Sequence, residues 1–373
     1  METPGLIVWR FITLIIGCMT AQGKSLFALK VLKAEDADAF ALEVKALIKI
    51  KPKPHLVNAV TAFKYQDKYH LIFKWAEGGN LADFWKSQDP TRDLSHDSIC
   101  WFAQQCHGLA DGLDGIHNAS ISLEELENDT TPQDSSQPQT GAAVEEENQI
   151  HGRHGDIKPQ NILWFSDHVN DYGRGVLKIT DFGITAFHSA RTTKVPAKYV
   201  QFTRTYAAPE IEVFEPNFEG FVSRPFDMWS LGCVYLEFIT WILLGYEEVE
   251  KFAKDRKAEK GIRKKFDEDT FYSIHKSDRS LFRSAEYSTA KNSVISWINK
   301  LRDHKDCSQF FHEFLDYIQQ KMLVDKESRE NSAMVREKLS KMFTACKRDP
   351  EYASTRIQPK ASRWREAFYI CFC

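Results

Sequence analysis

The first fifth of the chain alternates between strand-like and helix-like hydrophobic patterns. Ser25–Lys33 (SLFALKVLK) alternates apolar and polar positions, which predicts a strand. Asp36–Ile50 carries apolar residues at helical spacing, with acids first and lysines later, as the helix dipole favours. Leu56–Tyr65 and Tyr69–Trp75 predict two more strands joined by a turn at 66–68. The order strand, helix, strand, strand predicts a small sheet accompanied by one helix.

Helical patterns dominate the rest of the chain. Ser98–Asn118 has helical spacing, and Met228–Leu244 is apolar on nearly every side. The second segment carries Glu237, so a buried helix of a soluble domain fits it better than a membrane span. The other apolar run, Leu6–Cys18, is short for a spanning helix and is interrupted by Arg10. It predicts strands, with a signal or anchor segment as the alternative, and no membrane association is expected.

The segment Ala119–Ile150 differs in composition from its surroundings. It contains eight acidic residues, no lysine or arginine, and many Ser, Thr, Gln and Pro residues. Such a segment has little apolar surface to bury, so it predicts a disordered insertion at 119–150. Docking of a partner protein on this acidic insertion is the functional alternative. A second charged stretch, Glu247–Asp267, has the period of an exposed helix.

Composition limits the class of protein. The chain has 373 residues, a formal net charge of −3 and 43% hydrophobic residues, which suits one large domain or two lobes. The near balance of charge argues against a nucleic-acid binder, which would be basic. Eight cysteines occur without any C-x-x-C pair, so neither a disulfide framework nor an oxidising compartment is expected. The expected location is intracellular, in the cytoplasm or the nucleus.

The stretch His151–Phe165 (HGRHGDIKPQNILWF) concentrates polar chemistry in a short space. Asp156, Lys158 and Asn161 lie within six residues, and Pro159 between them excludes a helix interior. The cluster therefore predicts a loop that leads into a buried strand. Loops that direct several charged groups toward one point commonly bind a ligand.

Further signals follow one another in chain order. They are Lys30 in the first strand, Glu43 on the helix, the loop Asp156–Asn161, the triplet Asp181-Phe182-Gly183, the triplet Ala208-Pro209-Glu210, and Asp227 opening the apolar helix. Together, over about residues 25–345, this set resembles the eukaryotic protein kinase family. The resemblance implies an α+β, bilobal fold with a small antiparallel-sheet-plus-helix lobe and a larger, mainly helical lobe. The implied domain is 1–345, divided into 1–74 and 75–345, and the tail is 346–373.

Phosphoryl transfer explains why these residue types occur together. Lys30 can neutralise the α- and β-phosphates of ATP, and Glu43 can hold that lysine in place. Asn161 and Asp181 offer hard oxygen ligands of the kind that Mg²⁺ accepts beside phosphate oxygens and water. The expected cofactors are therefore ATP and Mg²⁺.

The substrate side of the reaction is expected at the same loop. Asp156 can orient the attacking hydroxyl and accept its proton, and Lys158 can stabilise charge on the transferred phosphate. Thr203 matches the threonine with which Ser/Thr-directed kinases contact both residues. The resemblance thus implies transfer of the ATP γ-phosphate to Ser or Thr of protein substrates.

Other matches concern adenine binding and internal support. The resemblance places Phe73 at the back of the adenine pocket, Ala28 and Leu163 on its two sides, and the backbone of Lys74, Trp75 and Ala76 along its edge. It places His154, Phe182 and Leu47 in an internal stack, with Asp227 anchoring His154 and Arg329 pairing with Glu210. The phrases WAEGGNLADFW and HGDIKPQNIL resemble a group of kinases of filamentous fungi.

Two departures from the family pattern leave alternatives open. The window Trp9–Gly23 lacks the glycine-rich G-x-G-x-x-G phosphate loop, and Gly155 stands where many kinases carry arginine. A pseudokinase, which binds partners through the same fold with weak or no catalysis, is therefore the alternative function. A chain truncated at its N-terminus by a wrongly predicted first exon is a third interpretation.

Overall fold

The computed structural model describes the chain over twelve ranges. They are residues 12–20, 23–32, 50–66, 68–89, 94–122, 149–166, 172–181, 195–196, 202–212, 221–259, 269–276 and 286–355. The predicted helix lies outside the described residues apart from Ile50, and with it Glu43 and Leu47. Phe182, Gly183 and the tail beyond residue 355 also lie outside them.

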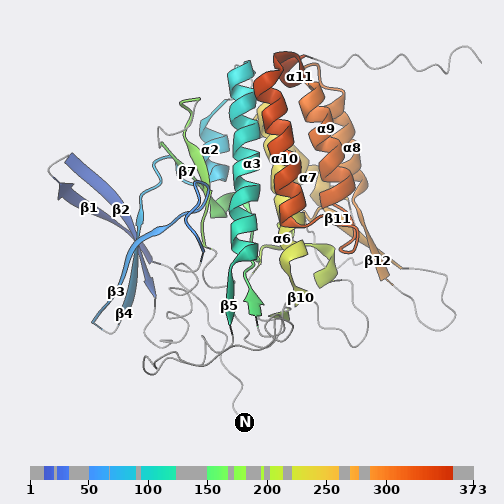
Figure 1. The fold of residues 1–373 in the computed structure, drawn as a ribbon. Coiled ribbons are helices and arrows are strands. Elements are labelled where there is room, and N and C mark those ends of the chain that lie inside the picture. The colour runs from blue at the N-terminus through green and yellow to red at the C-terminus, as the bar shows by residue number, and fades with distance from the viewer. Residues whose placement is uncertain are drawn as a thin grey trace, which may run out of the picture.

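A four-stranded antiparallel sheet forms the first lobe, in the order β1-β2-β4-β3 (Figure 1). The strands are β1 (Ile12–Thr20), β2 (Gly23–Leu32), β3 (Ala59–Tyr65) and β4 (Lys68–Lys74). The three strands expected from the alternating patterns are confirmed. Residues 66–68 connect β3 to β4, and residue 67 lies outside the described residues. Ala28 pairs with Phe73 and Lys30 with Leu71, so Ala28 and Lys30 lie on one face of β2.

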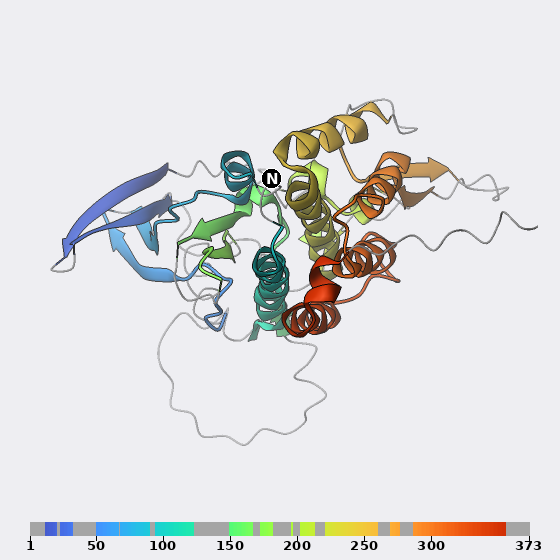
Figure 2. The same ribbon diagram turned by 90° about the horizontal axis from the view of Figure 1, so that it is seen from above.

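Helices build the second lobe, which stands beside the sheet in both views (Figures 1 and 2). The helices are α2 (Leu81–Ser87), α3 (His96–Asn118), α6 (Arg224–Leu244), α7 (Tyr246–Ala258), α8 (Asn292–Arg302), α9 (Gln309–Tyr317), α10 (Ser332–Arg348) and α11 (Pro350–Ser354). Short helical turns lie at η2 (Pro159–Asn161), η4 (Arg204–Tyr206), η5 (Pro209–Ile211) and η6 (Ile318–Met322). The α+β, two-lobed fold is as expected from the sequence.

Helix α6 is the centre of the helical lobe. Its residues from Phe226 to Leu243 are all buried, because a helix that is apolar on every side has no face to offer to water. By length and composition it is long enough to cross a membrane, but 94% of its apolar window is buried inside the protein. Pro225 lies in its first turn, where no hydrogen bond is lost, and Gly245 ends it with a φ of 87°.

Pairs of short strands hold the connections in place. They are β5 (Ser120–Ser122) with β6 (Gln149–His151), β7 (Ile162–Phe165) with β8 (Val176–Ile179), β9 (Val195–Pro196) with β10 (Phe221–Val222), and β11 (Tyr272–Lys276) with β12 (Glu286–Ala290). β7 is the strand expected after the polar loop, and β8 precedes Asp181. β5 and β6 correct the predicted insertion at both ends, because Ile121 pairs with Ile150 across an antiparallel ladder. Residues 123–148 between them lie outside the described residues.

Helix α7 differs from the exposed helix expected over Glu247–Asp267. It ends at Ala258, and residues 260–268 lie outside the described part of the chain. Val249, Phe252 and Arg256 are buried on one side of α7. The sequence did not predict this buried face, because only three of the thirteen residues of α7 are buried and most of the others are charged.

A buried ion pair links the start of α10 to the loop before α6. Both guanidinium Nη atoms of Arg329 donate to Glu210, at 2.8 and 3.0 Å, in the bidentate geometry that gives strong pairs. Arg329 also donates to the carbonyls of Val324 and Pro225. This pair confirms the expected Arg329–Glu210 contact and ties three segments together.

Replacing Arg329 with alanine should destabilise the helical lobe. The change leaves the Glu210 carboxylate without its partner in a largely buried site, which typically costs about 3–5 kcal/mol. Urea unfolding followed by circular dichroism measures the effect. Lys341→Ala, which removes a solvent-exposed pair with Glu337, is the control and should change the unfolding midpoint little. Equal midpoints for Arg329→Ala and the parent would show that the Arg329–Glu210 pair is not structural.

Candidate functional site

Asp156 is held by three neighbours that converge on its carboxylate. Its Oδ1 accepts the backbone N–H of Thr203 at 2.8 Å. Its Oδ2 accepts from Lys158 Nζ at 2.6 Å and from Asn161 Nδ2 at 3.2 Å. Lys158 Nζ also donates to Thr203 Oγ1 at 2.8 Å. The four residues predicted from the sequence therefore form one connected group around a carboxylate of fixed orientation.

The loop keeps this shape because η2 follows it directly. Pro159 starts the single 3₁₀ turn, and the Asn161 side chain donates back to the Asp156 carbonyl at 2.8 Å. Ile157 is fully buried beneath the loop, which leaves the polar residues on the other side. The spacing Asp-x-Lys-Pro-x-Asn thus closes on itself through its own side chains.

Asp227, at the start of α6, supports the loop from below. Its Oδ2 accepts the His154 N–H at 2.8 Å and its Oδ1 accepts the Gly155 N–H at 2.7 Å. His154 in turn accepts the Asp156 N–H at Nδ1, so its Nε2–H donates to the Thr180 carbonyl at 2.8 Å. This chain of bonds joins Asp227 to the loop and to the residue before Asp181, and it confirms the expected contact between Asp227 and His154.

Gly155 adopts a left-handed conformation with a φ of 80°. Glycine enters this region without the steric cost that a Cβ atom imposes. The sequence departure at this position, glycine in place of arginine, therefore suits the backbone that presents two consecutive N–H groups to Asp227.

Lys30 reaches across from the sheet to Asp181. Its Nζ lies 3.3 Å from Asp181 Oδ1, and the Lys30 side chain is 11% exposed. Asp181 follows β8 with a φ of 60°, an uncommon conformation for a residue with a side chain. The expected partner of Lys30, Glu43, lies outside the described residues. Asp181, which contacts Lys30, belongs to the helical lobe.

Asn161 and Asp181 lie on adjoining backbone segments. The Thr180 N–H donates to the Asn161 carbonyl at 3.0 Å, which brings the residue before Asp181 against the loop. The Asn161 amide nitrogen is committed to Asp156, which leaves its Oδ1 as an acceptor. One amide oxygen and one carboxylate fit Mg²⁺, which binds few protein ligands and keeps phosphate and water oxygens.

The residues expected around adenine also come together. Phe73, Leu163 and Val176 pack on a small cluster of Val57, Ala76 and Phe165 at the junction of the lobes. Ala28 faces this cluster through its pairing with Phe73. The Trp75 N–H donates to the Leu26 carbonyl at 3.3 Å, so it belongs to the sheet. The Trp75 N–H is therefore not available to adenine. The backbone groups of Lys74 and Ala76 remain candidates for hydrogen bonds to adenine.

The supporting residue that the sequence did not suggest is His117. It lies in the last turn of α3, and its Nε2 is 2.8 Å from Asp227 Oδ2. No sequence pattern connects two residues that are 110 positions apart. A buried histidine near the end of a long apolar helix is the one available hint.

The comparison with protein families now decides the class of protein. The model described as "Protein kinase domain" matches residues 143–338, just over half of the 373 residues. The chain belongs to the protein kinase domain family. The matched segment of this kinase contains the Asp156 loop, Asp181, Thr203 and α6.

Individual proteins are similar to parts of this chain. Cyclin-dependent kinase-like 4 of Mus musculus is 24% identical over 200 residues, which cover 53% of this chain and 43% of the relative. GLH-binding kinase 1 of Caenorhabditis elegans is 36% identical over 103 residues, 27% of this chain and 23% of the relative. Cyclin-dependent kinase E-1 of Arabidopsis thaliana is 33% identical over 87 residues, which cover 23% of this chain and 17% of the relative. The kinase chain thus spans less than half the length of each of these relatives.

Hydrogen bonds to the Asp227 carboxylate stabilise its ionised form. Burial would raise the pKa of this carboxyl, but bonds from His117 and from the loop N–H groups outweigh burial and lower the pKa. Since the folded pKa lies below the unfolded one, the carboxylate adds stability above the unfolded pKa. That stability is lost as the pH falls through the folded pKa.

Asp227→Ala should loosen the loop that holds Asp156. The change leaves two buried backbone N–H groups without acceptors, and we expect a loss of about 3–5 kcal/mol in unfolding free energy. Hydrogen exchange at the His154 and Gly155 amides should accelerate more than exchange in the interior of α3. Asp97→Asn, at an exposed position on α3, is the control. Unchanged protection of these two amides would contradict the supporting role of Asp227.

Proposed function

We propose that this kinase transfers the γ-phosphate of Mg²⁺-bound ATP to serine or threonine hydroxyls of protein substrates. The observation that carries the proposal is the Asp156 carboxylate, held by Thr203, Lys158 and Asn161 beside the Lys30–Asp181 pair. A carboxylate fixed in this way can accept a proton from a hydroxyl without reorganising.

Asp156 orients the acceptor in this proposal. The Asp156 side chain is 20% exposed, and both carboxylate oxygens already accept hydrogen bonds. An incoming hydroxyl donates to one of these oxygens and is thereby aimed at the phosphate. Lys158, 2.6 Å from the same carboxylate, places a positive charge where the transferred phosphoryl group passes.

Lys30, Asn161 and Asp181 serve the nucleotide. Lys30 projects from β2 toward Asp181 and is placed to contact the α- and β-phosphates. Asn161 and Asp181 are the residues that would hold Mg²⁺, which supplies charge neutralisation on the phosphates when bound. Phe73, Leu163 and Ala28 would surround the adenine ring with apolar surface.

Thr203 supports the assignment to serine and threonine. Its backbone and hydroxyl contact Asp156 and Lys158 together, so it defines one wall of the space in front of the carboxylate. The names of the matched relatives, two of them cyclin-dependent kinases or similar to these, agree with a protein substrate.

A second candidate function is a pseudokinase that binds partners without turnover. The observation in its favour is β1 (ITLIIGCMT), which has one glycine, Gly17, and pairs with β2 in unbroken register from Ile12 to Thr20. Backbone N–H groups engaged in a regular ladder are not free to surround phosphates as a glycine-rich loop does. Weak binding of Mg·ATP is the expected consequence.

Asp156→Asn tests the proposal directly. The change keeps the shape of the side chain but removes the proton acceptor, so phosphotransfer should fall by about 10²–10⁴-fold. Binding of Mg·ATP, measured by calorimetry, should stay within a few-fold of the parent because Asp156 does not face the nucleotide. The readout is transfer of labelled phosphate to a serine and threonine peptide library.

The parent protein and the exposed variant Asp97→Asn are the controls and should be equally active. Parental activity in Asp156→Asn would show that another group accepts the proton. A parent that binds peptides or partners but transfers no phosphate to any library member would support the pseudokinase.

A further inference from the structure

Strand β3 is the last strand in the order β1-β2-β4-β3, so it forms one edge of the sheet (Figure 1). Among the described residues, β4 is the strand that pairs with it. Every residue from Val60 to Tyr65 is exposed. Alternate residues of an antiparallel strand turn their N–H and C=O groups away from the paired strand. β3 therefore presents a row of backbone donors and acceptors to its surroundings.

This edge lacks most of the features that protect edge strands from pairing. Proteins commonly use proline, inward-pointing charges or a very short strand for that purpose. β3 (AVTAFKY) has seven residues, no proline and one charged side chain, Lys64. It carries three of the six large hydrophobic residues that are exposed in the described part of the chain, with exposed fractions of 53% for Val60, 41% for Phe63 and 59% for Tyr65. Exposed apolar residues gathered on an open edge are typical of a surface that another chain covers.

Phe63 and Tyr65 form an aromatic surface beside the edge. They are two residues apart, so they lie on the same face of β3. The Phe63 ring stacks on His70 of β4 with 4.9 Å between centroids, and the Tyr65 ring meets the edge of His70 at 6.4 Å. His70 is 9% exposed, and its Nδ1–H donates to the Lys68 carbonyl at 3.0 Å. The two exposed rings are thus supported from beneath by a buried one.

The surroundings of this edge are basic. Residues 50–74 contain five lysines and a single acid, Asp67, although the whole chain has a net charge of −3. The exposed lysines are Lys51, Lys64, Lys68 and Lys74. Lys64 lies on the opposite face of β3 from Phe63, with its Nζ 5.4 Å from the centroid of the Tyr69 ring. Two copies of this chain paired along β3 would bring lysines together, and like charges on paired strands are destabilising, so charge complementarity favours an acidic partner.

We propose that an extended, acidic segment of a partner protein adds to the sheet along β3, and that this segment alternates apolar and acidic side chains. Its backbone takes up the outward N–H and C=O groups of β3, as in other cases of strand addition. Its apolar side chains cover Phe63 and Tyr65 on one face, and its acidic side chains approach Lys64 on the other, because successive side chains of a strand point to opposite faces. This inference goes beyond the proposed function, since no residue of β3 belongs to the group around Asp156.

Fluorescence anisotropy with labelled peptides tests the proposal. The probe is an eight-residue peptide that alternates valine and glutamate, and the comparison peptide has lysine in place of glutamate. The parent protein should bind the glutamate peptide about 10-fold more tightly, because opposite charges replace like charges across the strand pair. The same glutamate peptide, N-methylated at every residue, keeps its side chains but has no N–H donors, and it should lose binding. Equal binding of the N-methylated form, or no binding of the glutamate peptide, would overturn the proposal.

Phe63→Thr and Tyr65→Thr test the aromatic surface. Threonine suits a strand, so each change removes a ring from an exposed position and leaves the backbone in place. Each variant should bind the glutamate peptide about 10-fold more weakly than the parent, as for a residue that anchors an interface. Met334→Thr, which removes a 48% exposed apolar side chain from α10, is the matched control and should bind as the parent does. Parental affinity in both aromatic variants would place the peptide elsewhere and contradict the proposal.

A double charge reversal, Lys64→Glu with Lys68→Glu, tests the electrostatic part. It should remove the preference for the glutamate peptide over the lysine peptide. Lys254→Glu with Lys257→Glu makes the same change in net charge at exposed positions of α7 and should keep the preference. If both double variants behave alike, the preference arises from net charge and not from the edge, and the proposal fails.

Sedimentation velocity distinguishes a partner protein from a second copy of this chain. The parent and Phe63→Thr should sediment as the same species over a range of protein concentrations. A dimer that forms in the parent as the concentration rises and is absent in Phe63→Thr would show that a second copy occupies β3. That result would overturn the assignment of an acidic partner.

Discussion

The loop that carries Asp156 depends on the hydrogen bonds that it makes to the Asp227 carboxylate, which is buried in the first turn of α6. The carboxylate accepts the N–H groups of His154 and Gly155 and contacts His117 from α3. A buried charge is tolerated only where such partners surround it, and here the partners are the loop itself. The loop therefore cannot move away without leaving the carboxylate unsatisfied, which fixes Asp156 relative to the core of the helical lobe.

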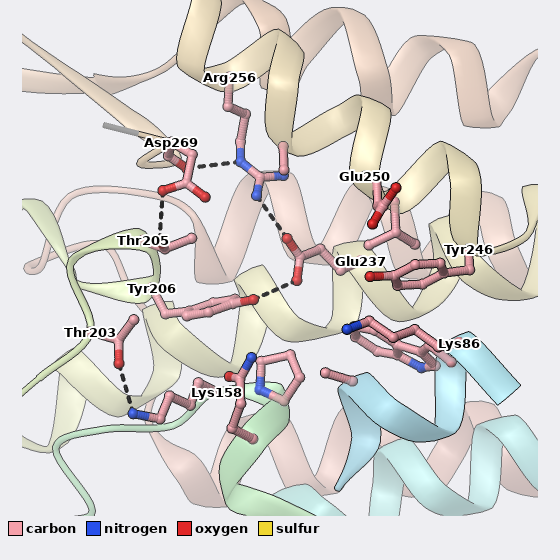
Figure 3. Close-up of a pocket in the computed structure, with 16 residues that line it drawn as sticks. Lys86, Lys158, Thr203, Thr205, Tyr206, Glu237, Tyr246, Glu250, Arg256 and Asp269 are labelled. Atoms are coloured by element: carbon pink, nitrogen blue, oxygen red, sulfur yellow. Dashed lines mark hydrogen bonds and ion pairs between the residues drawn. The ribbon is translucent and has the colours of Figure 1, made fainter. Parts of the chain in front are cut away.

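The same helix organises the neighbouring segments through a few polar residues on an otherwise apolar surface. Ser230 donates to the Tyr206 carbonyl, and Glu237 accepts from the Tyr206 hydroxyl. α6 thus holds the Asp156 loop with Asp227, the segment after Thr203 with Ser230, and Arg256 of α7 with Glu237 (Figure 3). Because α6 is buried along nearly its whole length, these contacts share one rigid support.

The two lobes contact each other through an ion pair and a small apolar cluster. Lys30 on β2 meets Asp181 after β8, and Phe73, Leu163 and Val176 pack on a small cluster of Val57, Ala76 and Phe165. The leading strand of the sheet, β1, forms a regular ladder in place of a glycine-rich loop.

Local patterns determined much of this protein. Alternation in Ser25–Lys33 predicted β2, and the apolar run after Asp227 predicted α6. The residues from Asp156 to Asn161 predicted a loop that leads into a buried strand, which is β7. These features arise from residues close in sequence, whose geometry follows from backbone periodicity and from proline. The limits of the acidic insertion were predicted less well, because residues at its two ends, Ile121 and Ile150, pair with each other in a short antiparallel ladder.

Only the tertiary structure decided which distant groups became partners. His117 and Asp227 are 110 positions apart, and Lys30 and Asp181 are 151 apart. The pair of Glu237 with Arg256 joins an apolar helix to a charged one, and the sequence alone showed the second as a solvated surface. Each of these bonds depends on how helices and sheet pack, since a buried charge takes whichever opposite charge the core brings within reach. The choice of counter-ion for Glu237 was therefore set by packing and not by any local pattern of residues.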